Sequence, residues 1–358
     1  MNILLFTSNQ KPIDGWSVVG FNIIDNIKKH KIEIFSSEEK KTCKIGKNKL
    51  KSELFRKYGH ITIFLDIISV LLYSKQKPDL IHCNVEYYAP VAMWLSIIYK
   101  IPYSITAHGT YGVLLPTKYK IYRRAFEKAN KIIAVSMFTK KKMELTIKAN
   151  YQVVLNGVDK NKFTPSNIKK EDIITFVGNL KRRKGLLFLL ETITKVKTIR
   201  PDISVIVIGD IDVNHKDYTK ISNYIKKNNL NIIFAGKVSE DQLIKFYQKA
   251  KLNILPSQTE PLYFEGFGLV HAEANACGTL TIGTLNSGNE DAISIDNGYL
   301  VHYGDTQELC NKILEVFTFD KYPTINYLSI QDWKDVGKNY ENIFENLLRE
   351  NKNQGCQK

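Results

Sequence analysis

Short aliphatic runs alternate with longer amphipathic stretches along almost the whole chain, and this alternation constrains the fold more than any other feature. The runs read NILLF, IEIF, LIHC, YSITA, KIIAV and YQVVL in the first part, and ITFVG, ISVIVIG, NIIFAG, LNILP and LTIGT in the second. Continuously apolar strands are buried on both faces, and right-handed crossovers supply the helices that cover them. The pattern therefore predicts an α/β fold of doubly wound parallel sheets.

One polar interruption divides this series. From Lys160 to Asp172 the segment KNKFTPSNIKKED carries charge, proline and serine in place of an apolar period. We expect the linker between two domains here, with domains over residues 1–160 and 172–328, each long enough to bury its own core. A last amphipathic segment, Gln331 to Glu350, has apolar residues at near-helical spacing and predicts a packing helix over residues 331–350.

The positive charge of the chain belongs to its first part. The net charge is +15, of which +14 precedes Asn150. Such an excess indicates an anionic partner, which could be nucleic acid, a membrane surface or a phosphorylated substrate, or else a solvated lysine-rich surface. No recognised nucleic-acid motif occurs, so we expect no nucleic acid as partner and keep a basic nucleic-acid-binding protein only as an alternative of another class.

A basic stretch followed directly by an apolar one predicts attachment to an anionic membrane surface. The basic residues are Lys40, Lys41, Lys44, Lys47, Lys49, Lys51, Arg56 and Lys57, with His60 near by. The apolar run Ile61 to Tyr73 contains Asp66 and falls short of a spanning helix. Cations beside an apolar helix suit interfacial attachment. In the alternative interpretation, the run belongs to the core and the lysines only aid solubility.

The cysteines and the N-terminus favour a cytoplasmic protein. The five cysteines are scattered and form no C-x-x-C pair, so neither a disulfide framework nor a zinc site is predicted. The start MNILLFTSNQ has no basic residues before its apolar run, so we expect a first strand and no signal peptide. The expected location is the cytoplasm, with peripheral attachment at the inner face of the cell membrane.

The segment EGFGLVHAEANACG carries the most specific chemistry. It follows the strand signal LNILP and holds Glu265 and Glu273, eight residues apart. On one helical element their carboxylates would be separated by roughly 12 Å, enough to reach opposite ends of one ligand. The backbone N–H groups at the expected helix start belong to Phe267, Gly268 and Leu269. Such groups favour a phosphate, and Gly266 and Gly268 permit its close approach. An ordinary amphipathic helix with a glycine-rich start is the alternative.

Other polar residues follow predicted strands in both domains. The segment GNLKRRKG, from Gly178 to Gly185, places Lys181, Arg182, Arg183 and Lys184 where a helix is expected to begin. A helix start favours anions, although such clusters are also common on solvated surfaces. In the first domain, His108 and Gly109 follow the strand YSITA, and Gly15 lies in the loop after the first strand.

With these residues assembled, nearly the whole chain resembles glycosyltransferase family 4. The resemblance rests on the spacing of Glu265 and Glu273, the basic segment around Lys184, NGVDKNKF from Asn156 to Phe163, the pair His108 and Gly109, and the closing tryptophan-containing helix. It implies the GT-B architecture of two Rossmann-like domains facing a central cleft, with the C-terminal helix packing back on the N-terminal domain. It also implies an N-terminal acceptor-binding domain and a C-terminal nucleotide-sugar-binding domain.

The resemblance assigns expected roles to individual residues. Glu273 would hold the ribose hydroxyls of a nucleotide-sugar, Glu265 would contact the donor sugar, Lys184 would bind the diphosphate and His108 would face the sugar. The catalytic residues would thus be His108, Lys184 and Glu265. The donor-binding residues would be Gly15, Asn179, Arg182, Arg183, Lys184, Glu265, Gly266, Phe267, Gly268, Leu269 and Glu273.

One departure affects the diphosphate contacts. Family members often carry arginine where this chain has Asn179, so the usual pair of cations is incomplete. We expect Arg182 or Arg183 to supply the second cation.

Competing chemical patterns are weak. Gly266-x-Gly268-x-x-His271 lacks the third glycine of a dinucleotide fingerprint, and no G-x-x-x-x-G-K-[ST] occurs. Asp210 and Asp212 have no further clustered ligand and suggest a polar turn, so neither a metal nor another cofactor is expected.

The sequence therefore predicts a retaining, metal-independent glycosyltransferase. It would move a sugar from a UDP- or GDP-sugar donor to a hydroxyl group of a saccharide or lipid-linked acceptor, in bacterial-type cell-surface polysaccharide or glycolipid assembly. A nucleotide-sugar epimerase of GT-B fold is the alternative.

Overall fold

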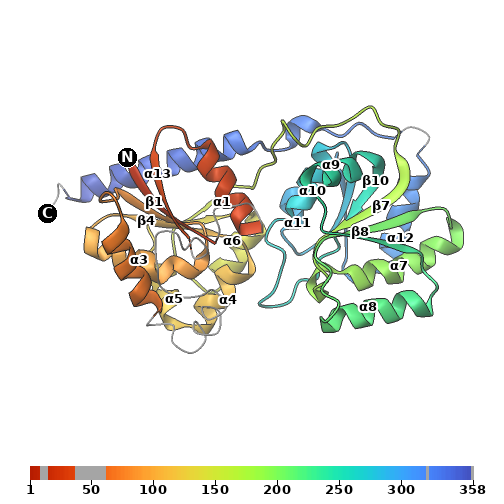
Figure 1. Cartoon of the computed structure of the whole chain (residues 1–358), viewed down its shortest axis with the longest axis horizontal. Coiled ribbons are helices and arrows are strands. Elements are labelled where there is room, and N and C mark those ends of the chain that lie inside the picture. The colour runs from red at the N-terminus through yellow and green to blue at the C-terminus, as the bar shows by residue number, and fades with distance from the viewer. Residues whose placement is uncertain (9–14, 37–61, 320–321, 356–358) are drawn as a thin grey trace. The chain divides into compact units, whose positions relative to one another are not determined.

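The computed structural model describes residues 1–8, 15–36, 62–319 and 322–355. The chain divides into two compact units (Figure 1), Met1–Asn156 together with Trp333–Lys358, and Gly157–Asp332. The basic stretch Lys40–Lys57, His60 and Ile61 lie outside the described residues.

The N-terminal unit is built on a parallel sheet with strand order β2-β1-β3-β4-β5-β6. Its strands are β1 (Asn2–Thr7), β2 (Lys31–Ser36), β3 (Leu80–Cys83), β4 (Tyr103–Ala107), β5 (Lys131–Ala134) and β6 (Tyr151–Val153). They coincide with the predicted aliphatic runs. β1 pairs with β2 on one side and with β3 on the other, and Leu4, Leu5 and Phe6 are buried. A central parallel strand has both faces covered, which explains its unbroken apolar sequence.

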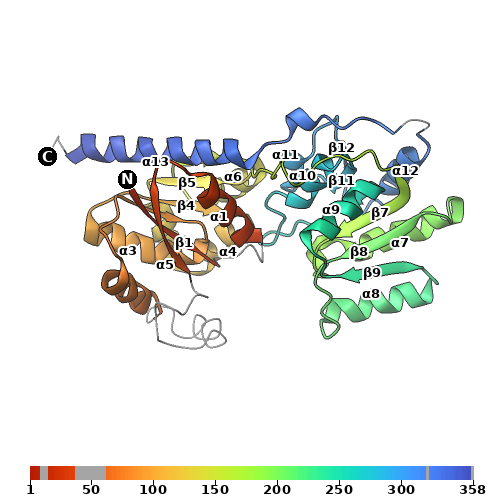
Figure 2. The ribbon, with the colours of Figure 1, turned by 45° about the horizontal axis from the view of Figure 1, so that its top comes forward.

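Helices cover both faces of this sheet. They are α1 (Gly15–Asn26), a helix over residues 62–73, α3 (Ala89–Tyr99), α4 (Thr110–Lys118), α5 (Lys120–Glu127) and α6 (Met137–Glu144), with a 3-10 turn over Glu86–Tyr88. The C-terminal helix α13 (Trp333–Gly355) packs against α1 (Figure 2). Glu341 Oε1 accepts the Lys28 N–H at 2.8 Å, and the hydroxyl groups of Tyr340 and Thr106 lie 2.9 Å apart. The predicted packing of this helix on the N-terminal domain is confirmed.

The second unit holds a parallel sheet with strand order β12-β11-β10-β7-β8-β9. Its strands are β7 (Glu171–Val177), β8 (Ser204–Ile208), β9 (Ile232–Gly236), β10 (Ala250–Ile254), β11 (Leu280–Thr284) and β12 (Gly298–Val301). Its helices are α7 (Leu186–Ile199), α8 (Lys216–Lys227), α9 (Glu240–Lys249), α10 (Leu269–Ala276), α11 (Asn289–Ala292) and α12 (Thr306–Phe317). Both units are thus doubly wound α/β folds, as predicted.

The polar segment that we expected as the linker belongs to the second unit. Phe163 is buried, Lys170 Nζ donates to Thr279 Oγ1 at 2.7 Å, and Val158 pairs with Asp332. The unit boundary instead falls between Asn156 and Gly157. Polar composition marked this segment as a loop, but a few anchoring contacts decide which unit carries it.

Candidate functional site

Several of the predicted donor-binding residues of the second unit lie beside the point where its strand order reverses. β10 pairs with β7 on one side and with β11 on the other. The connections from β7 run toward β8 and β9, whereas β10 begins the other half of the sheet. Open α/β sheets bind ligands outside the carboxyl ends of the strands at such a switch point. Three loops meet here, those that follow β7, β10 and β11.

Backbone hydrogen bonds hold these three loops together. The Gln258 N–H donates to the Arg183 carbonyl at 2.7 Å, which joins the loop after β10 to the loop after β7. The Gly288 N–H donates to the Glu265 carbonyl at 2.9 Å, which joins the loops after β11 and β10. These two hydrogen bonds therefore tie the three loops to one another.

Glycines make this close approach of the loops feasible. Gly185 has φ +77°, and a Cβ atom built there would overlap the carbonyl oxygen of Pro256. A Cβ atom at Gly288 would overlap the carbonyl oxygen of Gly266. Any larger residue at either position would push two of the three loops apart.

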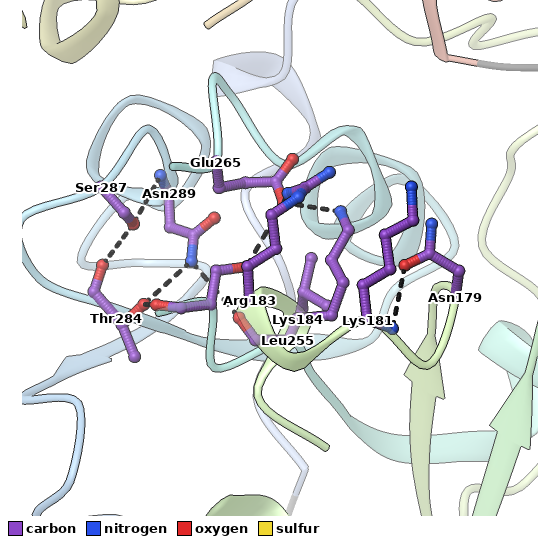
Figure 3. Close-up of polar contacts among 10 residues, drawn as sticks. Asn179, Lys181, Arg183, Lys184, Leu255, Glu265, Thr284, Ser287 and Asn289 are labelled. Carbon is purple, nitrogen blue, oxygen red and sulfur yellow. Dashed lines mark hydrogen bonds and ion pairs between the residues drawn. The ribbon is translucent and has the colours of Figure 1, made fainter. Parts of the chain in front are cut away.

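The centre of the site is an ion cluster on Glu265. Lys184 Nζ lies 2.6 Å and Arg183 Nη1 2.9 Å from Glu265 Oε2, as Figure 3 shows. Ser257 Oγ donates to the same oxygen at 3.3 Å. The side chains of Lys184 and Glu265 are 14% and 13% exposed, and that of Arg183 is 29% exposed. Two cations and one carboxylate thus share one partly buried place, with a net positive charge that suits an anion.

Burial and charge shift the pKa values of this cluster. Burial acts to raise the pKa of Glu265, but the charges of Lys184 and Arg183 outweigh it and lower that pKa to about 2. Burial lowers the pKa of Lys184 and the neighbouring Arg183 adds to this, while the Glu265 carboxylate counteracts both. A second anion beside these cations would favour their charged forms further.

Helix α10 starts next to this cluster. Its N-cap residue is Gly268, which has φ +83°. The helix start therefore has no side-chain cap. Glu265 lies in the preceding loop, so the prediction that Glu265 and Glu273 share one helical element is wrong. The left-handed Gly268 interrupts the backbone path between them. Glu265, Gly266 and Phe267 form the loop, and Leu269 opens the helix.

Glu273 lies within α10, four residues after Leu269 and so about one turn from its start. Its Oε2 accepts the hydroxyl of Tyr247, from α9, at 3.3 Å. Burial raises the pKa of Glu273 to about 7, and the Tyr247 hydrogen bond opposes this rise. The side chain retains some exposure. Glu273 therefore is a carboxylate that changes its charge near neutral pH.

The rest of the basic loop points elsewhere. Arg182 donates through Nε to Gln258 Oε1 at 3.3 Å, and its backbone N–H donates to Asp217 Oδ2 at 2.9 Å. Lys181 and Arg182 line a cavity of about 320 Å³ that also touches Tyr303. Asn179 Oδ1 accepts the Lys181 N–H at 3.3 Å (Figure 3). Of the two arginines, Arg183 is the one that accompanies Lys184.

His108 and Gly15 belong to the N-terminal unit. His108 Nε2 lies 2.6 Å from the carbonyl oxygen of Asn84, and its backbone N–H donates to Glu86 Oε1 at 2.8 Å. Gly15 opens α1 and is exposed. Asn84 and Glu86 directly follow β3, and β1 and β3 flank the switch point of this sheet. The roles expected for His108 and Gly15 remain predictions.

Two side chains that contact the predicted residues were not predicted from the sequence. Glu86 is fully buried, and burial raises its pKa to about 7 while the His108 N–H acts in the opposite direction. Its position just after the strand signal LIHC could have drawn attention to it. Tyr247, the partner of Glu273, carried no signal, because it lies on an ordinary amphipathic helix 26 residues away.

Two other features bear on the predictions. Asp212 Oδ1 accepts the Asn214 N–H at 3.0 Å, while Asp210 faces Lys237 at 3.7 Å.

Over the described ranges, no group of three or more His, Cys, Asp or Glu side chains is placed to hold a metal ion. Among the same residues, no helix combines the length and apolar character needed to cross a bilayer.

Family models match both parts of the chain. A model described as Glycosyltransferase Family 4 matches residues 28–162, and one described as Glycosyl transferases group 1 matches residues 158–324.

The curated proteins that are similar in sequence include the following two. An uncharacterized glycosyltransferase of Methanocaldococcus jannaschii is 32% identical over 244 residues, which cover 66% of this chain and 65% of that protein, just under two thirds of its length. The capsular polysaccharide biosynthesis glycosyltransferase CapM of Staphylococcus aureus is 25% identical over 287 residues, which cover 71% of this chain and 72% of that protein.

Solved structures share the fold. The sucrose-phosphate synthase from Thermosynechococcus elongatus has a TM-score of 0.79 at 18% identity, over 98% of this chain and 99% of that one. The HepE protein of Anabaena, in complex with UDP and glucose, has a TM-score of 0.75 at 18% identity, over 97% of this chain and 100% of that one.

Proposed function

Since this chain belongs to the glycosyltransferases, matching family 4 in its N-terminal part and group 1 in its C-terminal part, we propose that it transfers a sugar from a nucleoside diphosphate to a hydroxyl acceptor. The observation that carries this proposal is the convergence of Lys184 and Arg183 on Glu265, beside the start of α10. Cations and the start of a helix at one switch point suit the diphosphate of such a donor.

The proposed chemistry is stabilisation of the leaving group. When the bond between sugar and diphosphate breaks, negative charge grows on the phosphate oxygens, and fixed donors are most effective where charge develops. Lys184, Arg183 and the α10 start would supply these donors. Glu265 would then pass from its contact with the two cations to a contact with the donor sugar, and Glu273 would accept hydrogen bonds from the ribose hydroxyls. In this proposal His108 faces the sugar, and the acceptor attacks from the same face, so that configuration is retained.

The proposed donor is a UDP- or GDP-sugar, and the proposed acceptor is a saccharide or lipid-linked molecule in polysaccharide or glycolipid assembly. The complex of the Anabaena neighbour with UDP supports the first part. The name of the Staphylococcus aureus relative, which refers to capsular polysaccharide biosynthesis, supports the second. Neither match favours a nucleic-acid-binding protein.

Thermal unfolding of the full chain with UDP-, GDP- and ADP-sugars tests the donor. A ligand at 100 times its Kd adds about 2.7 kcal/mol to the free energy of unfolding, which is readily measured. The matched variants are Lys184→Met, which should lose the shift, and Lys181→Met, an exposed neighbour that should keep it. Absence of a shift with every nucleotide-sugar, or equal shifts in both variants, would contradict the proposed site.

Two further measurements separate the alternatives. Release of free nucleoside diphosphate that depends on an added acceptor indicates a transferase, whereas acceptor-independent release favours the epimerase. We propose that no divalent cation takes part, because Lys184 and Arg183 carry the positive charge. Activity should then persist in excess chelator. Full loss, restored by Mg²⁺ or Mn²⁺, would overturn this and make Asp210 and Asp212 the first ligands to examine.

A further inference from the structure

Two helices of the N-terminal unit present apolar side chains to solvent. In the helix over residues 62–73, Phe64 is 61% and Leu72 71% exposed, and Leu65 and Leu71 are also exposed. In α3, Trp94, Ile97 and Ile98 are all about half exposed. These seven side chains are called the apolar patch below. Their spacings, 64-65-71-72 and 94-97-98, place each set on one face of its helix.

The charge distribution of these helices is the reverse of an ordinary surface helix. A helix at the surface normally buries its apolar stripe and turns charged residues to water. Here the helix over residues 62–73 contains one charged residue, Asp66, and that residue is buried. The α3 sequence APVAMWLSIIY contains none. The solvent-facing sides of both helices therefore carry no charge, so the patch is suited to an apolar surrounding.

The two helices that carry the patch lie next to each other in the N-terminal unit. Figures 1 and 2 both show the helix over residues 62–73 beside α3. The C-terminal ends of both helices lie within the electrostatic reach of the same carboxylate, Glu33. Ser74 Oγ donates to Glu33 Oε2 at 2.9 Å, and burial together with the Glu33 charge raises the pKa of Tyr99, the last residue of α3. Several large exposed apolar side chains on neighbouring helices favour an interaction site.

Charge indicates which partner the patch contacts. Lys75, Lys77 and Lys100 follow the ends of the two helices and are exposed, and the first 149 residues carry a net charge of +14. Apolar side chains bordered by cations match the interface of an anionic bilayer, where acyl chains lie beneath negatively charged headgroups. At about 1.5 Å per residue, the 12-residue helix is about 18 Å long and too short for a bilayer core of about 30 Å.

We propose that the apolar patch docks this chain on an anionic phospholipid bilayer, with both helices lying in the interface. This inference is independent of glycosyl transfer, because it concerns different residues from those of the proposed donor site. It extends the expectation from the basic stretch to α3, which carried no such signal in the sequence.

Vesicle cosedimentation of the full chain tests the proposal. Vesicles of phosphatidylcholine with phosphatidylglycerol should bind the protein, and binding should weaken with salt and in phosphatidylcholine alone. Leu72→Gln with Ile97→Gln should weaken binding by about tenfold or more, because burying an exposed leucine or isoleucine contributes more than a factor of ten. The matched control is Leu145→Gln, since Leu145 lies in the same unit outside the patch and is 79% exposed.

Trp94 provides a second readout within the patch. Its fluorescence should shift to shorter wavelength and be quenched by brominated lipid, and Trp94→Phe should remove that response while keeping most of the binding. The nucleotide-sugar thermal shift should be the same in all these variants, so failure of docking is distinguishable from failure of the proposed function.

Three outcomes would overturn the proposal. These are binding unaffected by Leu72→Gln with Ile97→Gln, an unchanged Trp94 signal on anionic vesicles, or a dimer that this double variant converts to a monomer without any vesicle binding. The last result would assign the patch to a second copy of the chain.

Discussion

Lys184 Nζ lies 2.6 Å from Glu265 Oε2, and this contact joins two loops whose residues are 81 positions apart. Arg183 reaches the same oxygen. In the absence of a ligand, the carboxylate therefore neutralises part of the charge that we assign to the diphosphate. A bound diphosphate would compete with Glu265 for both cations, and this competition underlies the first two predictions.

Substitution of the two glutamates should have different effects on the binding of UDP alone. Glu265→Gln removes the internal competitor for Lys184 and Arg183, so UDP should bind as tightly as to the wild type or up to about tenfold more tightly, while turnover falls. Glu273→Gln should weaken the binding of UDP and of UDP-glucose to the same extent, because both ligands contain the ribose. Calorimetric titration measures both. Equal losses of UDP affinity in the two variants would contradict the division of roles.

The two neighbouring arginines should differ in their effect on turnover. Arg183→Ala should lower turnover by about 10- to 100-fold, because a charge-assisted contact to a partly desolvated phosphate contributes a few kcal/mol. Arg182→Ala should change it little, because its side chain contacts Gln258 and borders a separate cavity. Steady-state kinetics of both variants show which arginine contributes to turnover. If neither matters, Lys184 acts without a second cation.

Glu86→Gln should stabilise the protein at alkaline but not at acidic pH. The pKa of Glu86 is about 7 in the folded protein, against an ordinary 4.5. The unfolded chain thus ionises first, so the folded state loses stability as pH rises from 4.5 to 7. Glutamine cannot ionise, so at about pH 8 the free energy of unfolding of the variant should exceed that of the wild type by on the order of 1–3 kcal/mol.

Urea unfolding at about pH 4.5 and about pH 8 checks this. Any cost of burying an unpaired amide would be the same at both pH values. The informative quantity is therefore how the difference in unfolding free energy between variant and wild type changes with pH. A difference that stays constant, or that favours the wild type as pH rises, would show that Glu86 is not the titrating group.

Gly185→Ala should destabilise the C-terminal unit more than Gly236→Ala. Both glycines have similar φ, +77° and +69°, so the backbone strain of about 1–2 kcal/mol is common to both substitutions. At Gly185 the new Cβ would overlap the Pro256 carbonyl oxygen, whereas nothing lies within 4 Å of a Cβ at Gly236. Gly185→Ala should lower both the thermal unfolding temperature and the affinity for UDP. Equal losses in the two variants would show that the loops adjust freely.

Local pattern was enough to predict the strands and the fold class. The run YSITA became β4 and NILLF became most of β1, because a strand buried on both faces needs unbroken apolar sequence wherever it lies in the chain. The closing amphipathic segment formed α13, and its packing against α1 followed the family resemblance. These features depend on the period and composition of short segments, which the sequence states directly.

Contacts between distant residues were decided only by the tertiary structure. Glu265 and Lys184 are 81 residues apart, and Glu273 and Tyr247 are 26 apart, so no local period reports either pair. The spacing of the two glutamates suggested one helix, but the positive φ of Gly268 separates them into loop and helix. Likewise, the apolar sequence of α3 was compatible with a fully buried helix. Packing against β3, β4 and α5 determined which of its side chains face solvent, because burial depends on the neighbours that the fold supplies.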